Sequence, residues 1–204
     1  GPLEVRVEDS EDKRFTESFA ITGEATAPPS AAAESVPEPK DFWTGPVNSA
    51  VPETLTGGTV IRANDVAALV KRGGVVVVDV SNSPPRPEKL APQAVWLPPP
   101  HPVIPGSLWF AGVGAGSVDA GTDAFYRRRL AEVTAKNLDH PIIVYCHERC
   151  WLSWNAAKRA IRYGYRHVYW FPDGIEGWRA AGFETSVAQP ETAPSVTAVM
   201  TRAG

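Results

Sequence analysis

Residues 141–164 of this chain, PIIVYCHERCWLSWNAAKRAIRYG, place both of its cysteines between a predicted strand and a predicted helix. The run from Ile142 to Tyr145 is continuously apolar and β-prone, which is typical of a strand covered on both faces. From Ser153 onward apolar residues recur at helical spacing, and Gly164 is a suitable helix end. Because a covered strand needs packed layers on both sides of its sheet, this stretch favours an α/β fold.

The rest of the central sequence repeats this alternation of strand and helix. Further strands are predicted over residues 74–80 and 167–171, with a short one at 60–61, and helices over 63–72, 123–134 and around 178–180. Thr122 is the expected N-cap of the second of these helices. Strands and helices joined by short links predict a three-layer fold, with a mostly parallel central sheet and helices on both faces.

At 204 residues and 43% hydrophobic content, the chain can bury one core with appendages. Residues 1–40 are poor in aromatics and rich in Glu, Ala, Ser and Pro, so we expect a flexible N-terminal tail in which residues 19–21 suggest only a weak strand. Residues 41–186 are expected to form the folded domain, with Trp43 packed at its edge. Residues 187–204 are expected to be a flexible C-terminal tail.

Residues 81–105 are dense in proline. Such a segment cannot be a helix and can hardly be a central strand, because proline lacks the backbone donor that both need. A long irregular segment inside a compact domain usually covers or serves a functional site. Its Trp96, Leu97 and His101 indicate that it packs against the domain.

Charge and hydropathy exclude two classes of partner. The net charge of −3 argues against nucleic acid, and the basic run 127–129 lies in a predicted helix, where a solvated face is its ordinary role. No apolar run approaches the roughly 18 residues of a membrane span. No signal peptide is visible, and the first residues, GPLE, resemble the remnant of a cleaved tag.

Cys146 is expected at the carboxyl end of its strand, in the crevice where open α/β sheets bind ligands. The amides of the loop and the dipole of the following helix favour an anion there, such as a thiolate, a persulfide or an oxyanion. Arg149 would lower the pKa of the thiol further, whereas Glu148 would act against it. We therefore predict Cys146 as a thiolate nucleophile, although a small buried cysteine packing as a hydrophobe is the alternative.

Cys150 follows four residues later, across a loop that must curl. A curled loop can bring such a pair within the ~4.4–6.8 Å Cα separation that a disulfide needs. Cys150 is then a second thiol that resolves a sulfenic, persulfide or mixed-disulfide form of Cys146, or else an inert packing cysteine. Asp79, at the end of the strand predicted over 74–80, is expected either to support the same crevice or to brace the neighbouring loop.

Metal and cofactor sites are less well supported. His147 could ligate a metal together with the two thiols, but a fourth ligand would have to come from a distance, such as His101. We therefore predict no metal site and no required cofactor. Four tryptophans could form a stacking pocket for a flat cofactor, although core packing is the more ordinary role. They are Trp151, Trp154, Trp170 and Trp178.

The order of these motifs resembles the rhodanese-like domain over residues 60–184. The motifs are VVVVDV, IPGS, IVYC with a curled loop into an Ala-rich helix, GYRHVYWFPDGIEGW and AAGF. In that family the strand-end cysteine carries a persulfide whose anion is cradled by the loop amides. The resemblance implies that Cys146 is the persulfide cysteine and that Asp79 is the family's strand aspartate. It implies substrate binding by His147, Glu148, Arg149, Trp151, Leu152 and Ser153.

A closer resemblance covers residues 39–186. CHERCWLSWNAAKRA, WLPPPHPVIPGSLW and the DFW lead-in resemble bacterial proteins named for a CxxCW-type motif and associated with pyrroloquinoline-quinone (PQQ)-dependent alcohol catabolism. This implies a periplasmic protein that works beside quinoprotein dehydrogenases and c-type cytochromes. PQQ or metal binding by the chain itself is a weaker expectation.

The chain departs from the usual sulfurtransferase pattern at two places. Ser81 stands where the family usually has an arginine, and the loop has Cys150, Trp151 and Ser153 where the family has glycine and an arginine. A second thiol favours thiol redox chemistry or a specialised acceptor over thiosulfate turnover, with a small sulfur-containing or thiol compound as substrate. The alternatives are a non-enzymatic cofactor- or metal-binding module for a quinoprotein dehydrogenase and a noncatalytic interaction domain.

Overall fold

The computed structural model describes residues 36–191 apart from residues 92 and 97–98. The strand suggested at residues 19–21 and most of both predicted tails lie outside this part. Within it, six parallel strands form one sheet in the order β1-β6-β5-β2-β4-β8. Their bounds are Thr59–Val60 (β1), Val168–Phe171 (β6), Ile142–Tyr145 (β5), Val76–Asp79 (β2), Leu108–Phe110 (β4) and Pro190–Glu191 (β8). Within the same residues, β3 (His101–Val103) and β7 (Ser186–Ala188) pair antiparallel and form a second sheet.

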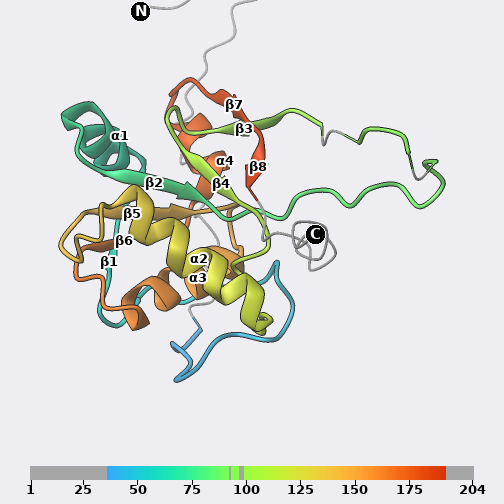
Figure 1. Cartoon of the computed structure of the whole chain (residues 1–204). Helices are drawn as coiled ribbons and strands as arrows, with labels where there is room; N and C mark the ends of the chain where they lie inside the picture. Colours follow the sequence, from blue (N-terminus) through green and yellow to red (C-terminus); the bar gives the residue numbers. More distant parts are fainter. Residues whose placement is uncertain (1–35, 92, 97–98, 192–204) are drawn as a thin grey trace, which may run out of the picture. The chain divides into compact units, whose positions relative to one another are not determined.

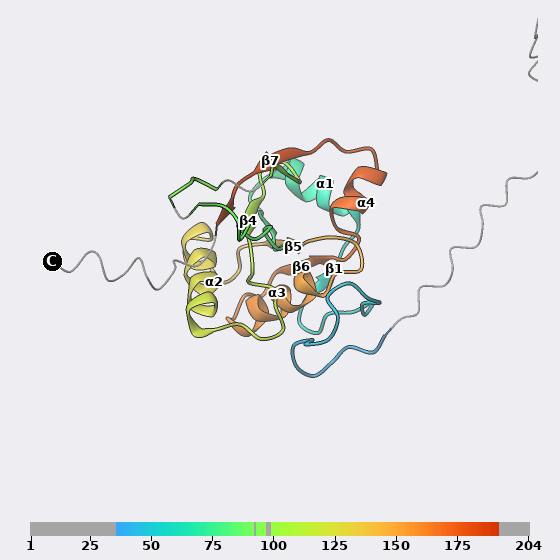
Figure 2. The ribbon, with the colours of Figure 1, turned by 90° about the vertical axis from the view of Figure 1, so that its right-hand side faces the viewer.

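Helices cover both faces of the larger sheet (Figures 1 and 2). Helices α1 (Ala63–Arg72) and α4 (Gly174–Ala180) lie on one face, and α2 (Ala120–Val133) and α3 (Trp151–Arg162) lie on the other. Each face has its own apolar cluster, one containing residues of α1 and α4 and the other residues of α2 and α3. The predicted α/β fold, with a mostly parallel sheet between two helical layers, is confirmed.

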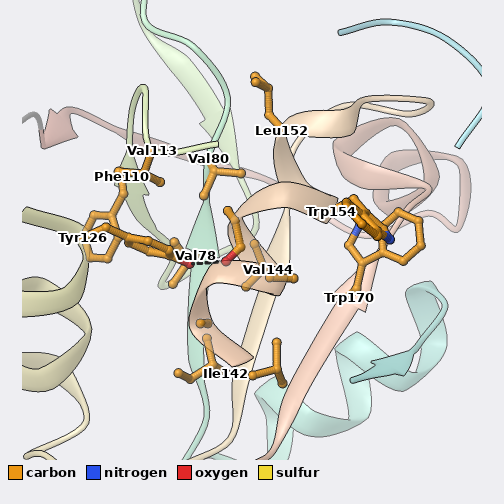
Figure 3. Packing of buried hydrophobic residues seen from close by; sticks show 14 of the residues in the cluster. Val78, Val80, Phe110, Val113, Tyr126, Ile142, Val144, Leu152, Trp154 and Trp170 are labelled. Atoms are coloured by element: carbon orange, nitrogen blue, oxygen red, sulfur yellow. Dashed lines mark hydrogen bonds between the residues drawn. The ribbon is translucent and has the colours of Figure 1, made fainter. Parts of the chain in front are cut away.

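Strand β5 lies in the middle of this sheet, and all four of its residues are buried. This explains its unbroken apolar sequence, because both of its faces meet helices. Figure 3 shows Phe110 and Tyr126 packed at one end of the larger cluster and Trp154 beside Trp170 at the other. The four tryptophans that suggested a stacking pocket are all buried and pack in the core.

Two helices begin earlier than their sequence predicts. Asp119, not Thr122, caps α2, and its side chain accepts a hydrogen bond from the Thr122 amide at 3.0 Å. Helix α3 begins at Trp151, with Cys150 as its N-cap. The loop between the cysteine strand and α3 is therefore short, and the second cysteine lies at the helix terminus.

The folded domain extends beyond both boundaries expected from the sequence. The predicted C-terminal tail contains β8 and most of β7, which pair with β4 and β3. Because this pairing uses backbone hydrogen bonds at the edges of the sheets, the two strands show no apolar sequence pattern. At the other end, the Glu38 carboxylate accepts hydrogen bonds from Thr54 and Thr56. The Pro39 carbonyl accepts one from Lys158 at 2.7 Å.

The proline-rich segment packs against the domain at its end, as predicted, but not in its middle. Figure 1 shows the segment projecting away from the sheet, and its residue Val95 is 84% exposed, so this part does not pack down as expected. Leu97, which was expected to pack, lies outside the described residues. The last residues of the segment do pack, and they form strand β3. Pro102 is accommodated there because β3 is an edge strand that pairs only with β7. None of the helices in the described part of the chain has the length and apolar content of a membrane span.

Candidate active site at the cysteine loop

The two predicted functional strands end side by side. Strands β2 and β5 are parallel neighbours, with Asp79 in register with Tyr145. Cys146 follows β5 directly, and the Val80 amide donates to the Tyr145 carbonyl at 3.0 Å. Because the strands run in the same direction, Asp79 and Cys146 reach the same edge of the sheet. The predicted proximity of these two strand ends is found in the structure.

Cys146 is a fully buried thiol. Its Sγ lies 3.5 Å from the Cys150 carbonyl oxygen and 3.7 Å from the His147 carbonyl oxygen, and its single S–H can donate to either. Burial raises the pKa of Cys146 well above its ordinary value, and its hydrogen bond to Cys150 raises the pKa further. At neutral pH this residue is therefore a protonated thiol.

Cys150 has the opposite character. The hydrogen bond from the Cys146 thiol lowers the pKa of Cys150 to about 7, against the effect of burial. The backbone amides of Leu152 and His147 and the charge of His147 act in the same direction. The Leu152 amide lies in the first turn of α3, where helix N–H groups lack intrahelical partners, and the His147 amide belongs to the preceding loop. The electrostatics thus favour Cys150 as the thiolate, whereas the sequence predicted Cys146.

Helix α4 fixes the cysteine loop from the other side. The Glu176 carboxylate contacts His147 Nδ1 at 2.8 Å with one oxygen and accepts from the Glu148 amide at 2.8 Å with the other. The Ile175 amide donates to the Cys146 carbonyl at 3.0 Å. Burial acts to raise the pKa of Glu176, but the bonds from His147 and Glu148 outweigh it, and the net pKa is lowered. Glu176 was not predicted as a functional residue, although it lies in the DGIEGW motif.

Asp79 orients a second imidazole at the same edge. The buried carboxylate accepts from the Ser81 amide at 2.8 Å and contacts His101 Nε2 at 2.8 Å. The His101 ring stacks on Trp109 with 4.0 Å between centroids and meets the His147 ring edge-on at 6.3 Å. Two imidazole–carboxylate pairs therefore lie beside the thiol loop. Within the described residues, Cys, His, Asp and Glu side chains do not gather in threes as a metal-ligand set.

Replacing Asp79 with alanine is expected to destabilise the fold by about 3 kcal/mol, because the buried Ser81 amide and the His101 ring both lose their acceptor. Asp79→Asn, which keeps one carbonyl oxygen and the shape, is expected to lose less than half of that. Urea unfolding of both variants measures the difference. Equal losses would show that the shape of the side chain, and not its hydrogen bonds, is what matters.

The six residues predicted to bind substrate divide into two groups. His147, Glu148 and Arg149 lie exposed on the loop. The other three, Trp151, Leu152 and Ser153, form the first turn of α3 and are buried. Ser153 donates to the Cys150 carbonyl at 3.2 Å and accepts from the Trp170 indole at 3.0 Å. The second group therefore holds the cysteine loop in shape and does not face solvent.

A segment far away in the sequence covers Cys150. We call residues 43–50 the strap; it follows the first blue residues of the chain in Figure 1. Asn48 forms an antiparallel bridge with Cys150, flanked by hydrogen bonds from the Ser49 amide to the Arg149 carbonyl (3.0 Å) and from the Trp151 amide to the Val47 carbonyl (2.9 Å). With the strap in place, only 2% of Cys150 is exposed.

The strap is anchored at its first residue. The Trp43 ring stacks on Trp151 with 4.4 Å between centroids and 13° between planes. The buried Asn155 side chain accepts from the Trp43 amide at 2.8 Å and donates to its carbonyl at 3.0 Å. Trp43 does pack at the domain edge as predicted, but the contact with the thiol loop has no local sequence signal.

Solved structures that are similar to this chain share low sequence identity with it. A search of curated proteins finds no significant match. Similar solved structures include a thiosulfate sulfurtransferase from Pseudomonas aeruginosa, which is 19% identical with a TM-score of 0.43 over 69% of this chain and 22% of its own. A 3-mercaptopyruvate sulfotransferase from Escherichia coli is 15% identical with a TM-score of 0.41, over 69% of this chain and 61% of its own.

This chain therefore spans 22% and 61% of the lengths of these two proteins. A third structure is a polysulfide-sulfur transferase homodimer from Wolinella succinogenes, 12% identical with a TM-score of 0.40, over 67% of this chain and 81% of its own. The family model for the rhodanese-like domain matches residues 62–181, more than half of the chain, from the start of α1 through the cysteine loop to the end of α4. The chain thus belongs to the rhodanese-like family.

Proposed function

We propose that this rhodanese-like protein carries out sulfur chemistry with a pair of thiols, Cys150 as the attacking thiolate and Cys146 as the resolving thiol. One observation carries the proposal. The two cysteines are in direct contact, with Cys146 Sγ 3.5 Å from the Cys150 carbonyl oxygen; the side-chain hydrogen bond between them lowers the pKa of Cys150 to about 7, and burial raises the pKa of Cys146. A thiolate beside a protonated thiol is the arrangement that thiol–disulfide exchange needs.

The chemistry has two steps. Cys150 attacks the S–S bond of a persulfide or disulfide donor, forms a new S–S bond and releases the other half of the donor as a thiolate. The Cys146 thiol then loses its proton and attacks the Cys150 sulfur, which forms the Cys146–Cys150 disulfide. The leaving group takes the proton and departs as hydrogen sulfide from a persulfide or as a thiol from a mixed disulfide. A dithiol reductant returns the pair to its reduced form for another turnover.

The cellular setting of the proposal comes from sequence resemblance. The CHERCW motif and the WLPPPHPVIPGSLW segment support a periplasmic protein associated with PQQ-dependent alcohol oxidation, beside a quinoprotein dehydrogenase or a c-type cytochrome. A dithiol that cycles through a disulfide suits an oxidising compartment, where protein disulfides form and persist.

Mass spectrometry of the reduced full chain after exposure to glutathione persulfide or to cystamine tests the proposal. We expect a loss of two hydrogens, mapped to a Cys146–Cys150 disulfide, with hydrogen sulfide released from the persulfide. Thiols that remain unmodified under both treatments would contradict the proposal. That result would favour a non-enzymatic accessory module instead.

A further inference from the structure

Neither thiol is open to a substrate in this structure. Cys146 is fully buried and Cys150 is 2% exposed. The part of the chain that pairs with Cys150 is the strap, and several of its own residues, among them Thr44 and Pro46, are exposed. A substrate that reaches Cys150 must therefore take the place of the strap.

The strap shows what geometry such a substrate would have. The two flanking hydrogen bonds run between Ser49 and Arg149 and between Trp151 and Val47, so Asn48 and Cys150 form a non-hydrogen-bonded antiparallel pair. The Cα atoms of such a pair are about 4.5 Å apart and their side chains lie close. This separation falls within the range that a disulfide bridges, about 4.4–6.8 Å. Asn48 therefore occupies the position from which a cysteine could bond to Cys150.

We propose that the substrate of the thiol pair is a disulfide in an extended segment of another protein, which displaces the strap and pairs antiparallel with residues 149–151. This inference rests on the proposed function and names its substrate class. The segment recovers both backbone hydrogen bonds that the strap gives up, which is recognition by strand addition. Its cysteine takes the position of Asn48, opposite Cys150.

The exchange follows directly from this register. The Cys150 thiolate attacks the sulfur of the segment's cysteine, an intermolecular disulfide forms, and the former partner of that cysteine leaves as a thiolate. The Cys146 thiol loses its proton and attacks the Cys150 sulfur, and the segment departs with a free thiol. Two electrons move from the thiol pair to the partner disulfide, and no further reactant is consumed in this half-cycle.

The register is tested first within the chain, in a Cys146→Ser background that removes the competing thiol. Asn48→Cys is expected to cross-link to Cys150 almost completely under mild oxidation. Val47→Cys is the matched control, because neighbouring residues of an extended segment point to opposite sides and its cysteine would face away. Equal cross-linking of the two variants would overturn the proposed register.

Substrate recognition is tested with a peptide that has the sequence of residues 44–51 with cysteine in place of Asn48, activated as a thionitrobenzoate disulfide. A control peptide carries an N-methyl group on the serine that follows the cysteine, which removes the donor to the Arg149 carbonyl. We expect the control to react about tenfold more slowly with the full chain, the loss typical of one backbone hydrogen bond. Trp43→Ala, which loosens the strap, should increase the reaction rates of both peptides and leave the ratio of the two rates unchanged.

The outcomes separate the two proposals. If cystamine oxidises the thiol pair but the two peptides react equally fast with both the native chain and Trp43→Ala, the inference about protein disulfides is wrong and the proposed function stands. If Cys150 reacts with neither cystamine nor the peptides in either protein, the proposed function itself is wrong.

Discussion

Replacing Cys146 with serine is expected to leave the first attack intact and to stop the second, so that the donor accumulates on Cys150. The serine hydroxyl can still form a side-chain hydrogen bond with Cys150, so the pKa of Cys150 should stay near 7. Cys150→Ser is the matched variant. It leaves only Cys146, whose pKa burial raises well above its ordinary value. Because even an ordinary thiol with a pKa of ~8.5 is only ~3% ionised at pH 7, its rate should fall at least about tenfold.

The measurement is the rate and site of modification by cystamine at pH 7, mapped by mass spectrometry of the digested protein. Cys146→Ser should carry a stable cysteamine adduct on Cys150, and Cys150→Ser should remain almost unmodified. If Cys146 in the Cys150→Ser protein reacts as fast as the native chain, Cys146 is the nucleophile, as the sequence suggested.

The pH dependence of the same reaction gives an independent check. Because the pKa of Cys150 is about 7, the native rate should rise through pH 7 and level off above it. The rate of an ordinary thiol with a pKa near 8.5 would still increase between pH 7 and pH 8.5. Cys146→Ala removes the hydrogen bond that lowers this pKa. Its inflection should therefore move to higher pH, with a lower rate near pH 6.5 and a similar rate at pH 9. An unchanged inflection would contradict the hydrogen-bonded pair.

Local sequence patterns were sufficient for the fold and for the position of the first thiol. The apolar run of β5 and the helical spacing after Ser153 place Cys146 at a strand end without any tertiary information. The order of acidity of the two thiols could not be predicted in the same way. It depends on α3 starting at Trp151, which places the Leu152 amide beside Cys150, and the strap makes this start favourable by accepting from the Trp151 amide.

Several contacts at the site could not be predicted from the sequence for a different reason. Asn48 and Cys150 pair through backbone groups, which every residue has, so no side-chain pattern predicts the contact. Strands β7 and β8 join the sheets by the same kind of backbone pairing. Glu176 bonds the loop through an acceptor that any exposed helix could offer. Contacts between distant segments that use the backbone or a single carboxylate leave no periodic signal.

Gly174 is the second position at which a large effect is expected, because it lies where α4 meets the cysteine loop. Its backbone φ is +58°, and a Cβ there would lie 2.5 Å from the His147 carbonyl carbon and closer still to the Cys146 carbonyl oxygen. These are backbone atoms, so Gly174→Ala must push the loop away from α4. The bond from the Ile175 amide to Cys146 would then be lost or lengthened.

We expect Gly174→Ala to destabilise the fold by about 3 kcal/mol or more, the range of a severe steric clash in a packed region. It should also slow thiol modification, because the amides around Cys150 shift with the loop. Gly182→Ala is the matched control, since its φ is +84° but no atom lies within 4 Å of the added Cβ. Backbone strain alone predicts a loss of roughly 1–2 kcal/mol there, with thiol reactivity unchanged. Urea unfolding and cystamine kinetics distinguish the two variants. Equal losses of unfolding free energy at both positions would mean that Gly174 is required because of strain at positive φ, and not because of its contact with the cysteine loop.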